Sequence, residues 1–249
     1  RRRDPGTRGS HGADSPNGRS RVRDDEDPQL RRDLVWWEIV VLIVAGFGAG
    51  LVHVMAGGGS SLTVPIMMFL GIPGPIANGT NRITIVAHNA SAIVTYLRHG
   101  VPHAKLCVTL TLVAIPPALL GAWLSTKLNN EQFEGLLAIV MVAVLILMQA
   151  PQAKKQSDAD NEPKNLRLGH VLMAIAGFWG GFIQIGMGFV VLPIMHRVMG
   201  LSLVDTNILK VFIIFTYTLL AVFVFAATSE VLWLVGAIAA LGNVAGLSL

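Results

Sequence analysis

Long apolar runs alternate with short polar breaks along the chain after residue 33. A helix needs about 20 mainly apolar residues to cross a bilayer, and several of these runs approach that length. Two of them, residues 62–72 and 186–199, are short. We expect the run at residues 104–126 to be kinked or broken, because it contains adjacent prolines at 116 and 117. The pattern predicts helical segments at residues 34–55, 62–72, 83–97, 104–126, 133–150, 168–185, 186–199, 208–228 and 231–249.

Helix-breaking residues interrupt the chain after the first of these runs. The stretch "HVMAGGGSSLTVPIM" at residues 53–67 contains three adjacent glycines, two serines and a proline. Relative to alanine, glycine costs about 1 kcal/mol and proline about 3 kcal/mol in a helix interior. A similar break, "GMG" at residues 186–188 followed by Pro193, recurs later. In lipid, broken backbone persists only where it is buried in protein or lines a wet cavity.

The second half of the chain repeats the marks of the first half in the same order. The matched marks are "GFGAG" at 46–50 with "GFWGG" at 177–181, Pro65 with Pro193, "GTN" at 79–81 with "DTN" at 205–207, and "LLGAW" at 119–123 with "ALGNV" at 240–244. We therefore predict an all-α, polytopic membrane protein with two internal repeats. Each repeat is expected to contain a Gly/Pro-broken helix or re-entrant segment.

These boundaries divide the chain into four parts. We predict a disordered cytoplasmic tail at residues 1–33, a first transmembrane repeat at 34–150, a cytoplasmic linker at 151–167 and a second repeat at 168–249. The second repeat has no counterpart of the run at 133–150, so we expect it to be truncated at its C-terminus.

Composition supports a membrane protein. The 249 residues are 53% hydrophobic and only 14% charged, against about 25% charged residues in soluble domains. Residues 1–33 alone hold nine of the 19 Lys and Arg and seven of the 15 Asp and Glu. This mixing of signs, as in "RDDEDPQ", is typical of a solvated tail and argues against a nucleic-acid partner.

Positive charge near the spans predicts their orientation in a cytoplasmic membrane. Basic clusters at residues 31–32, 98–105 and 154–167 are all expected on the cytoplasmic side. They share a side if residues 57–72 enter and leave by one face. The alternative, in which residues 62–72 form a full span, makes the two repeats inverted. The sequence does not determine the oligomeric state.

The paired breaks predict a central site for an anion. A helix N-terminus presents free N–H groups and a positive dipole end, and matching broken segments in two repeats point to a transporter's substrate site. Buried Arg and Lys side chains would add positive charge to this site. The candidate residues are Gly57, Gly58, Gly59, Ser60, Ser61, Thr80, Asn81, Arg82, Gln184, Gly186, Gly188, Thr206, Asn207 and Lys210. Structural alternatives remain open: close helix packing by the glycines, N-capping by the Thr-Asn pairs, and snorkelling of the two cations.

Other residues with chemical potential are few. His53 and His88 lie in apolar runs, where each is either a hydrogen-bonded interior histidine or a proton carrier, which leaves proton coupling open. The single cysteine, Cys107, excludes an internal disulfide and a CxxC motif. We predict no metal site and no cofactor.

The glycine-rich stretches resemble the TauE/SafE family of sulfite-exporter-like membrane proteins. The resemblance is carried by "GFGAGLVHVMAGGGSSLTVPIMMFLGIPGPIANGTN" and "GFWGGFIQIGMGFVVLPIMHRVMGLSLVDTN", and it covers about residues 35–249. It implies a permease for small, sulfur-containing anions such as sulfite or sulfonates. We therefore expect a secondary transporter in the bilayer and no enzyme. The rivals are a non-transporting scaffold and an intramembrane enzyme, the latter disfavoured because GxSxG and HExxH motifs do not occur in the sequence.

Overall fold

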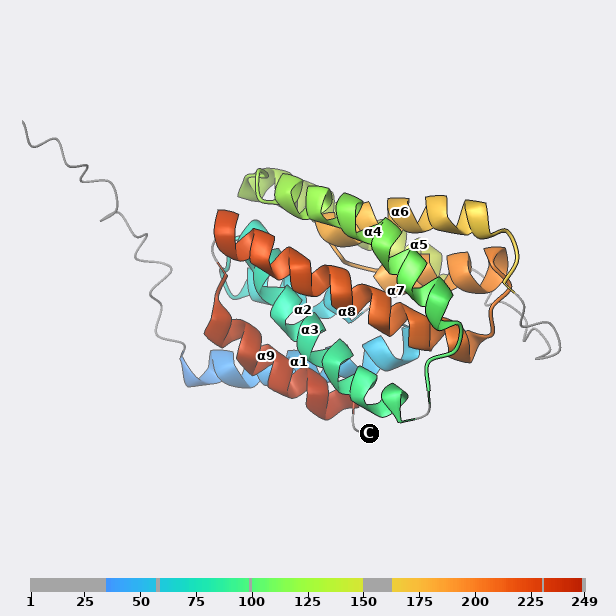
Figure 1. Cartoon of the computed structure of the whole chain (residues 1–249). Helices are drawn as coiled ribbons and strands as arrows, with labels where there is room; N and C mark the ends of the chain where they lie inside the picture. The colour runs from blue at the N-terminus through green and yellow to red at the C-terminus, as the bar shows by residue number, and fades with distance from the viewer. Residues whose placement is uncertain (1–34, 57–58, 99, 150–162, 230, 248–249) are drawn as a thin grey trace, which may run out of the picture. The chain divides into compact units, whose positions relative to one another are not determined.

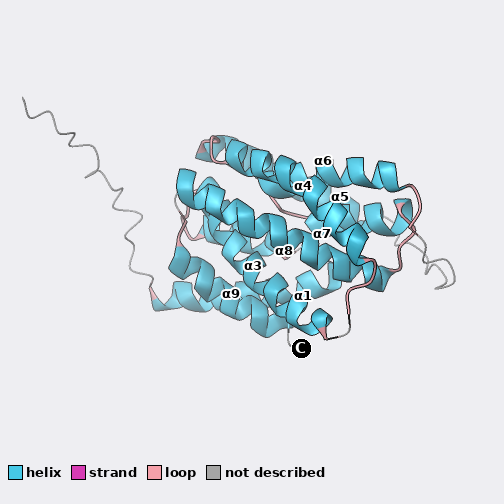
Figure 2. Cartoon of the chain, in the orientation of Figure 1, coloured by secondary structure: helices cyan, strands magenta, loops and turns pink. Residues whose placement is uncertain are grey.

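The chain folds into helices joined by short connections wherever its placement is defined (Figures 1 and 2). The structure, a computed structural model, describes residues 35–56, 59–98, 100–149, 163–229 and 231–247. The predictions for the N-terminal tail, for most of the linker and for two candidate glycines, Gly57 and Gly58, lie outside these residues.

Every apolar run of the predicted pattern corresponds to helix in the described residues, which contain no strand. In order, the helices are α1 (Trp36–Ala56), α2 (Ser60–Phe69), α3 (Gly74–Leu97), α4 (Ala104–Ser125), α5 (Asn130–Gln149), α6 (Leu166–Phe182), α7 (Met187–Pro193), a π-helical turn (Ile194–Val198), α8 (Leu203–Thr228) and α9 (Trp233–Leu247). The fold class is therefore all-α.

Two helices begin earlier than predicted, and this corrects the capping interpretation. Helix α3 begins at Gly74, with a proline in its first turn, where the missing N–H removes no intrahelical hydrogen bond. Helix α8 begins at Leu203, and the side chain of Ser202 caps it by accepting a hydrogen bond from the Asp205 amide at 3.0 Å. The two Thr-Asn pairs therefore lie inside helices and are not N-caps.

Helix α4 is not broken at its two prolines. It runs as one helix from Ala104 to Ser125, although each proline removes a backbone donor. Ala114 and Ala118, on either side of the prolines, are fully buried against α6. Close packing against α6 therefore outweighs the local preference for a break.

Small residues bring helices from the two halves together. Helix α1 lies beside α9, and α4 lies beside α6 (Figure 1). A Cβ added at Gly46 or Gly50 of α1 would meet the backbone of α9, and one added at Gly177 or Gly181 of α6 would meet the backbone of α4. Such small-residue contacts are how transmembrane helices approach closely. Packing is thus a structural role of "GFGAG" and "GFWGG".

The two close pairs use corresponding contacts. Gly46 faces Ala239 as Gly177 faces Ala114, Gly50 faces Asn243 as Gly181 faces Ala118, and Gly246 faces Phe47 as Gly121 faces Phe178. This correspondence supports the internal repeat, which stays a prediction. It also matches Gly121 with Gly246, one helical turn beyond the Gly242 suggested by the letters alone.

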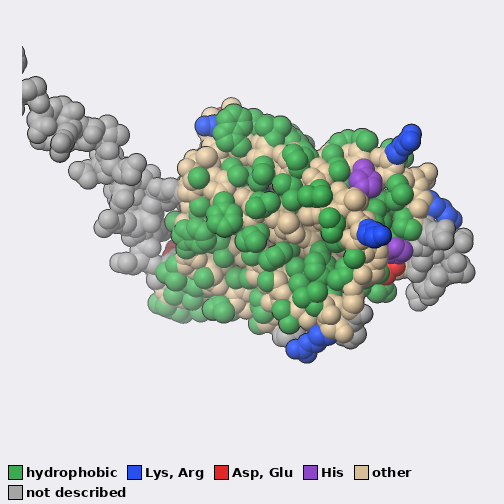
Figure 3. Space-filling model, in the orientation of Figure 1, with side chains coloured by type: hydrophobic (Ala, Val, Ile, Leu, Met, Phe, Trp, Pro, Cys, Tyr) green, Lys and Arg blue, Asp and Glu red, His purple; other side chains and the backbone are tan. Residues whose placement is uncertain are grey.

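The outer surface is strongly apolar. Leu112, Ile139, Phe223 and Leu241 are between 62% and 71% exposed. In Figure 3 hydrophobic side chains are spread over the visible face, and the Lys and Arg side chains lie mainly toward its edges. Three described helices, α1, α4 and α8, are long and apolar enough to cross a membrane. Lipid is the solvent that suits such a surface.

Candidate functional site

A fully buried arginine joins the two halves of the chain. Arg82, in α3, has no exposed surface. Its Nη1 donates to Gln184 Oε1 at 2.8 Å and to the Gly180 carbonyl at 3.3 Å, and its Nη2 donates to the Gly181 carbonyl. The two glycine carbonyls belong to the last turn of α6, where carbonyls lack helical partners and the helix dipole is negative. Arg82 is therefore held by a helix C-terminus and does not snorkel to the surface.

The Arg82 guanidinium is not neutralised by a carboxylate within the described part of the chain. The guanidinium also lies over the ring of Phe225, whose centroid is 4.5 Å from Arg82 Cζ. The Nε–H of Arg82 is buried and finds no hydrogen-bond partner in the described part of the chain. A buried cation that keeps an unused donor is costly unless something compensates it.

A second buried donor comes from α8. The Tyr217 hydroxyl, in α8, is buried and has no hydrogen-bond partner among the residues that the structure describes. A Cβ placed on Gly180 would lie 2.5 Å from this hydroxyl, so Tyr217 packs against the glycine whose carbonyl binds Arg82. The two groups are close enough to interact electrostatically. We name the arrangement of Arg82, Gln184 and Tyr217 the arginine site.

The chain between α6 and α7 is shaped to hold Gln184 in this site. Gln184 and Gly186 both have positive φ angles, +59° and +73°, so the backbone turns sharply here. The Gln184 Nε2 donates to Thr218 Oγ1 at 2.8 Å while its Oε1 receives Arg82. Both ends of the Gln184 side-chain amide are thereby held by hydrogen bonds. Gly186 adopts the positive φ angle that the backbone takes immediately before α7, a conformation that glycine allows at low cost.

A buried asparagine fixes the same turn from the first half. Asn78 Nδ2 donates to Ser125 Oγ at 2.9 Å and to the Phe182 carbonyl at 3.0 Å. Asn78 lies one turn before Arg82 on α3 and so aligns α3 with the ends of α4 and α6. Arg82 and Tyr217 of the arginine site therefore come from helices, and Gln184 comes from the turn that Asn78 binds through the Phe182 carbonyl.

The second buried cation belongs to a different cluster. Lys210, in α8, is 3% exposed, and its Nζ donates to Asn207 Oδ1 at 2.8 Å. Like Arg82, it does not snorkel, and it has no carboxylate partner among the described residues. Its ammonium acts electrostatically on the rings of His53 and His88.

The structure places the other predicted residues around these two clusters without joining them into one site. Asn81 Oδ1 accepts from Thr63 of α2 at 2.5 Å, and Thr80 Oγ1 accepts from the Leu232 amide at 3.1 Å. At the start of α2, Gly59 packs on α1, Ser60 is buried and Ser61 is half-buried. Gly188 is buried in α7. Thr206 is buried in α8, and its hydroxyl has no hydrogen-bond partner among the described residues.

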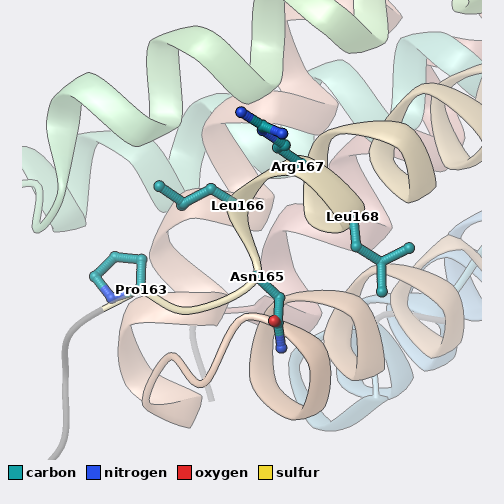
Figure 4. A pocket seen from close by; sticks show the side chains of 5 residues that line it. All are labelled: Pro163, Asn165, Leu166, Arg167 and Leu168. Atoms are coloured by element: carbon teal, nitrogen blue, oxygen red, sulfur yellow. The ribbon is translucent and has the colours of Figure 1, made fainter.

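A surface pocket occurs elsewhere. It lies at the start of α6 (Figure 4) and contains no predicted site residue; its lining residues are Pro163, Asn165, Leu166, Arg167 and Leu168. The arginine site itself is enclosed by packed helices, as the full burial of Arg82 and Tyr217 shows.

Comparison with known proteins identifies the family. The family described as "Sulfite exporter TauE/SafE" matches residues 42–249, which is most of the chain. This chain belongs to the TauE/SafE family. The match includes both glycine-rich breaks and both buried cations.

Curated relatives of this TauE/SafE protein are named as transporters. It is 26% identical over 215 residues to the "Probable membrane transporter protein ORF9" of a Sinorhizobium species, which covers 86% of this chain and 82% of that protein. It is 23% identical over 211 residues to a "Probable membrane transporter protein" of Haemophilus influenzae, covering 85% and 83%. No solved structure matches it significantly. The family and the relatives indicate a membrane transporter rather than an enzyme.

Sequence reasoning missed several polar residues of the site. Tyr217 and Thr218 form part of "TYT" at 216–218, a polar run within an apolar span, and that run was the available signal. Asn78 and Asn243 are likewise amides among apolar or small residues. A polar side chain inside a transmembrane segment is expected to face the interior of the bundle, so each was detectable in principle.

Proposed function

We propose that this TauE/SafE protein is a multi-pass secondary transporter that carries small sulfur-containing oxyanions, such as sulfite or sulfonates, across the cytoplasmic membrane. The observation that carries the proposal is Arg82, a fully buried guanidinium with no carboxylate partner among the described residues and with an unused Nε–H donor.

Charge supports an anion as the cargo. Arg82 and Lys210 are both buried, whereas the buried carboxylate among the described residues, Glu38, lies in the first turn of α1. Cations inside a membrane protein face a cavity or a partner, because an uncompensated charge is expensive in lipid. An anion entering the bundle would supply the missing negative charge.

The unused donors support an oxyanion. Arg82 Nε–H and the Tyr217 hydroxyl are two buried donors that lack an acceptor among the described residues, and the two groups are close enough to interact electrostatically. Sulfite and sulfonate groups carry several acceptor oxygens around one sulfur and can accept from two donors at once. Hydrogen bonds to charged groups are worth about 1.5–3 kcal/mol each, so two of them are enough to make binding selective.

Anion flux in proteoliposomes tests the proposal, with Tyr217→Phe as the principal variant. This change removes only the hydroxyl, which has no hydrogen-bond partner of normal geometry among the described residues. We expect the half-saturating concentration of sulfite or methanesulfonate to rise at least tenfold, since a charged hydrogen bond is lost. Thermal stability should not fall. Tyr96→Phe, at the chain's other tyrosine, is the matched control and should leave flux unchanged.

Arginine variants extend the same test. Arg82→Gln should raise the half-saturating concentration roughly 10- to 100-fold. Arg82→Lys keeps the charge but loses the planar fork and should lie between Arg82→Gln and the unmodified protein. Normal flux in both Tyr217→Phe and Arg82→Gln would exclude the arginine site and favour a purely structural role for these residues.

A further inference from the structure

We infer that His53 and His88 form a proton-binding pair whose occupancy is coupled to that of the anion, so that the protein moves a proton and an anion together. The inference rests on the proposed anion transport and adds the coupling ion to it.

Two imidazole rings from different helices meet inside the bundle. His53 of α1 and His88 of α3 are 6% and 3% exposed, and their ring centroids are 4.1 Å apart. Each histidine comes from a helix that also packs on α9. Two buried imidazoles at this separation cannot both be positively charged imidazolium ions without strong repulsion, so the pair takes up at most one proton beyond its neutral form.

The hydrogen bonds leave the pair able to accept a proton. His88 Nδ1 lies 2.6 Å from Asn243 Oδ1, and because that oxygen only accepts, Nδ1 carries the hydrogen. In neutral His88 the lone pair is then on Nε2. His53 Nε2 is buried and has no hydrogen-bond partner within the described residues. When His53 carries its ring hydrogen on Nδ1, its Nε2 is a basic nitrogen that no described donor occupies.

The charged neighbour of the pair opposes protonation until an anion arrives. The groups around the rings are Lys210 from α8, which acts on both electrostatically, and the uncharged Asn243 from α9. No described carboxylate forms an ion pair with either ring. While Lys210 and Arg82 have no negative partner, their positive charges disfavour protonation of the histidine pair. An anion bound near these cations reduces the free-energy cost of that protonation.

Linkage makes this effect reciprocal. If a bound anion increases the affinity for a proton, a bound proton increases the affinity for the anion by the same factor. Arg82 and His88 are six residues apart on α3, which is about 9 Å along the helix axis. At an effective dielectric constant of about 20, an anion's unit charge at that distance changes the proton affinity of His88 on the order of tenfold. Proton and anion therefore occupy the protein together and cross in the same direction.

Methanesulfonate is the probe for the test, because it stays a monoanion throughout the working pH range, whereas sulfite changes its own charge. In proteoliposomes with the membrane potential clamped at zero, an outer pH one unit below the inner pH should drive about tenfold accumulation for one proton per anion. Exchange of methanesulfonate at equal pH on both sides reports anion transport without net proton movement.

His53→Gln combined with His88→Gln removes the titrating nitrogens and keeps polar side chains in their places. We expect this double variant to retain methanesulfonate exchange at equal pH and to lose accumulation driven by the pH gradient. His170→Gln is the control, since His170 lies on α6 and bonds to Thr109 and the Leu166 carbonyl, outside the pair. It should accumulate the anion as the unmodified protein does.

The outcomes separate the two proposals. Exchange without gradient-driven accumulation in the unmodified protein, or equal accumulation in the double variant, would refute proton coupling and leave anion transport standing. No exchange of sulfite or methanesulfonate by the unmodified protein would refute both. Proton uptake on adding methanesulfonate to the purified protein in weak buffer is a second measurement. It should occur in the unmodified protein, and its absence would also overturn the coupling, whether or not the variants fold.

Discussion

Two glycines on one helix turn allow a sharp test of how the halves are joined. Gly50 and Gly48 both lie in α1, two residues apart. A Cβ at Gly50 would overlap the backbone of Asn243 and approach Gly246 in α9, whereas a Cβ at Gly48 would meet nothing within 4 Å. Gly50→Ala and Gly48→Ala therefore add the same atom to the same helix in opposite environments.

The expected difference follows from two opposing effects. Replacing glycine by alanine in a helix favours folding by about 1 kcal/mol. Forcing an extra methyl group into a packed contact costs about 1–3 kcal/mol, and the upper end applies here because backbone cannot rotate away as a side chain can. Gly48→Ala should thus be neutral or stabilising, and Gly50→Ala should lower stability by roughly 2 kcal/mol.

Heating the detergent-solubilised protein and measuring the folded fraction by size-exclusion chromatography gives the midpoint temperature. A domain of this size shifts by about 2–4 °C per kcal/mol, so the two variants should differ by roughly 5–10 °C. Gly181→Ala, in the corresponding contact of α6 with α4, should behave as Gly50→Ala does. Equal midpoints for the Gly48 and Gly50 variants would refute the close approach of α1 and α9.

Three further outcomes are expected. Asn78→Leu should lower the midpoint temperature, because it leaves the Phe182 carbonyl and the Ser125 hydroxyl without their donor at a cost of about 1–3 kcal/mol each; an unchanged midpoint would contradict this. Lys210→Gln should weaken methanesulfonate binding in flux assays, with less effect than Arg82→Gln if Lys210 acts on the anion at longer range. Arg167→Cys in a Cys107→Ala background should resist impermeant thiol reagents added outside intact cells, because its basic cluster predicts a cytoplasmic position; ready labelling would reverse the orientation.

The helices were predictable because their signal is local. Apolar runs and glycine-proline punctuation gave every helix within a few residues, except where packing outweighed a local preference. Helix α4 continues through Pro116 and Pro117 because its neighbours hold it against α6. Helix α3 starts at Gly74 rather than at the predicted residue 83, because a proline is compatible with a first turn and the polar "NGTN" that follows finds partners inside the bundle.

The arginine site was only half predictable, and the reason is its connectivity. Sequence reasoning selected Arg82 and Gln184 separately, one for its charge and one for its nearness to a glycine break, but no spacing rule joins residues from different halves. Their hydrogen bond exists because α3 meets the C-terminal end of α6, whose exposed carbonyls suit a cation. From the sequence we considered helix N-termini as anion sites and therefore did not consider that a helix C-terminus could hold the cation. The helix C-terminus orients Arg82 but supplies only partial negative charge, and the proposed anion would complete the neutralisation.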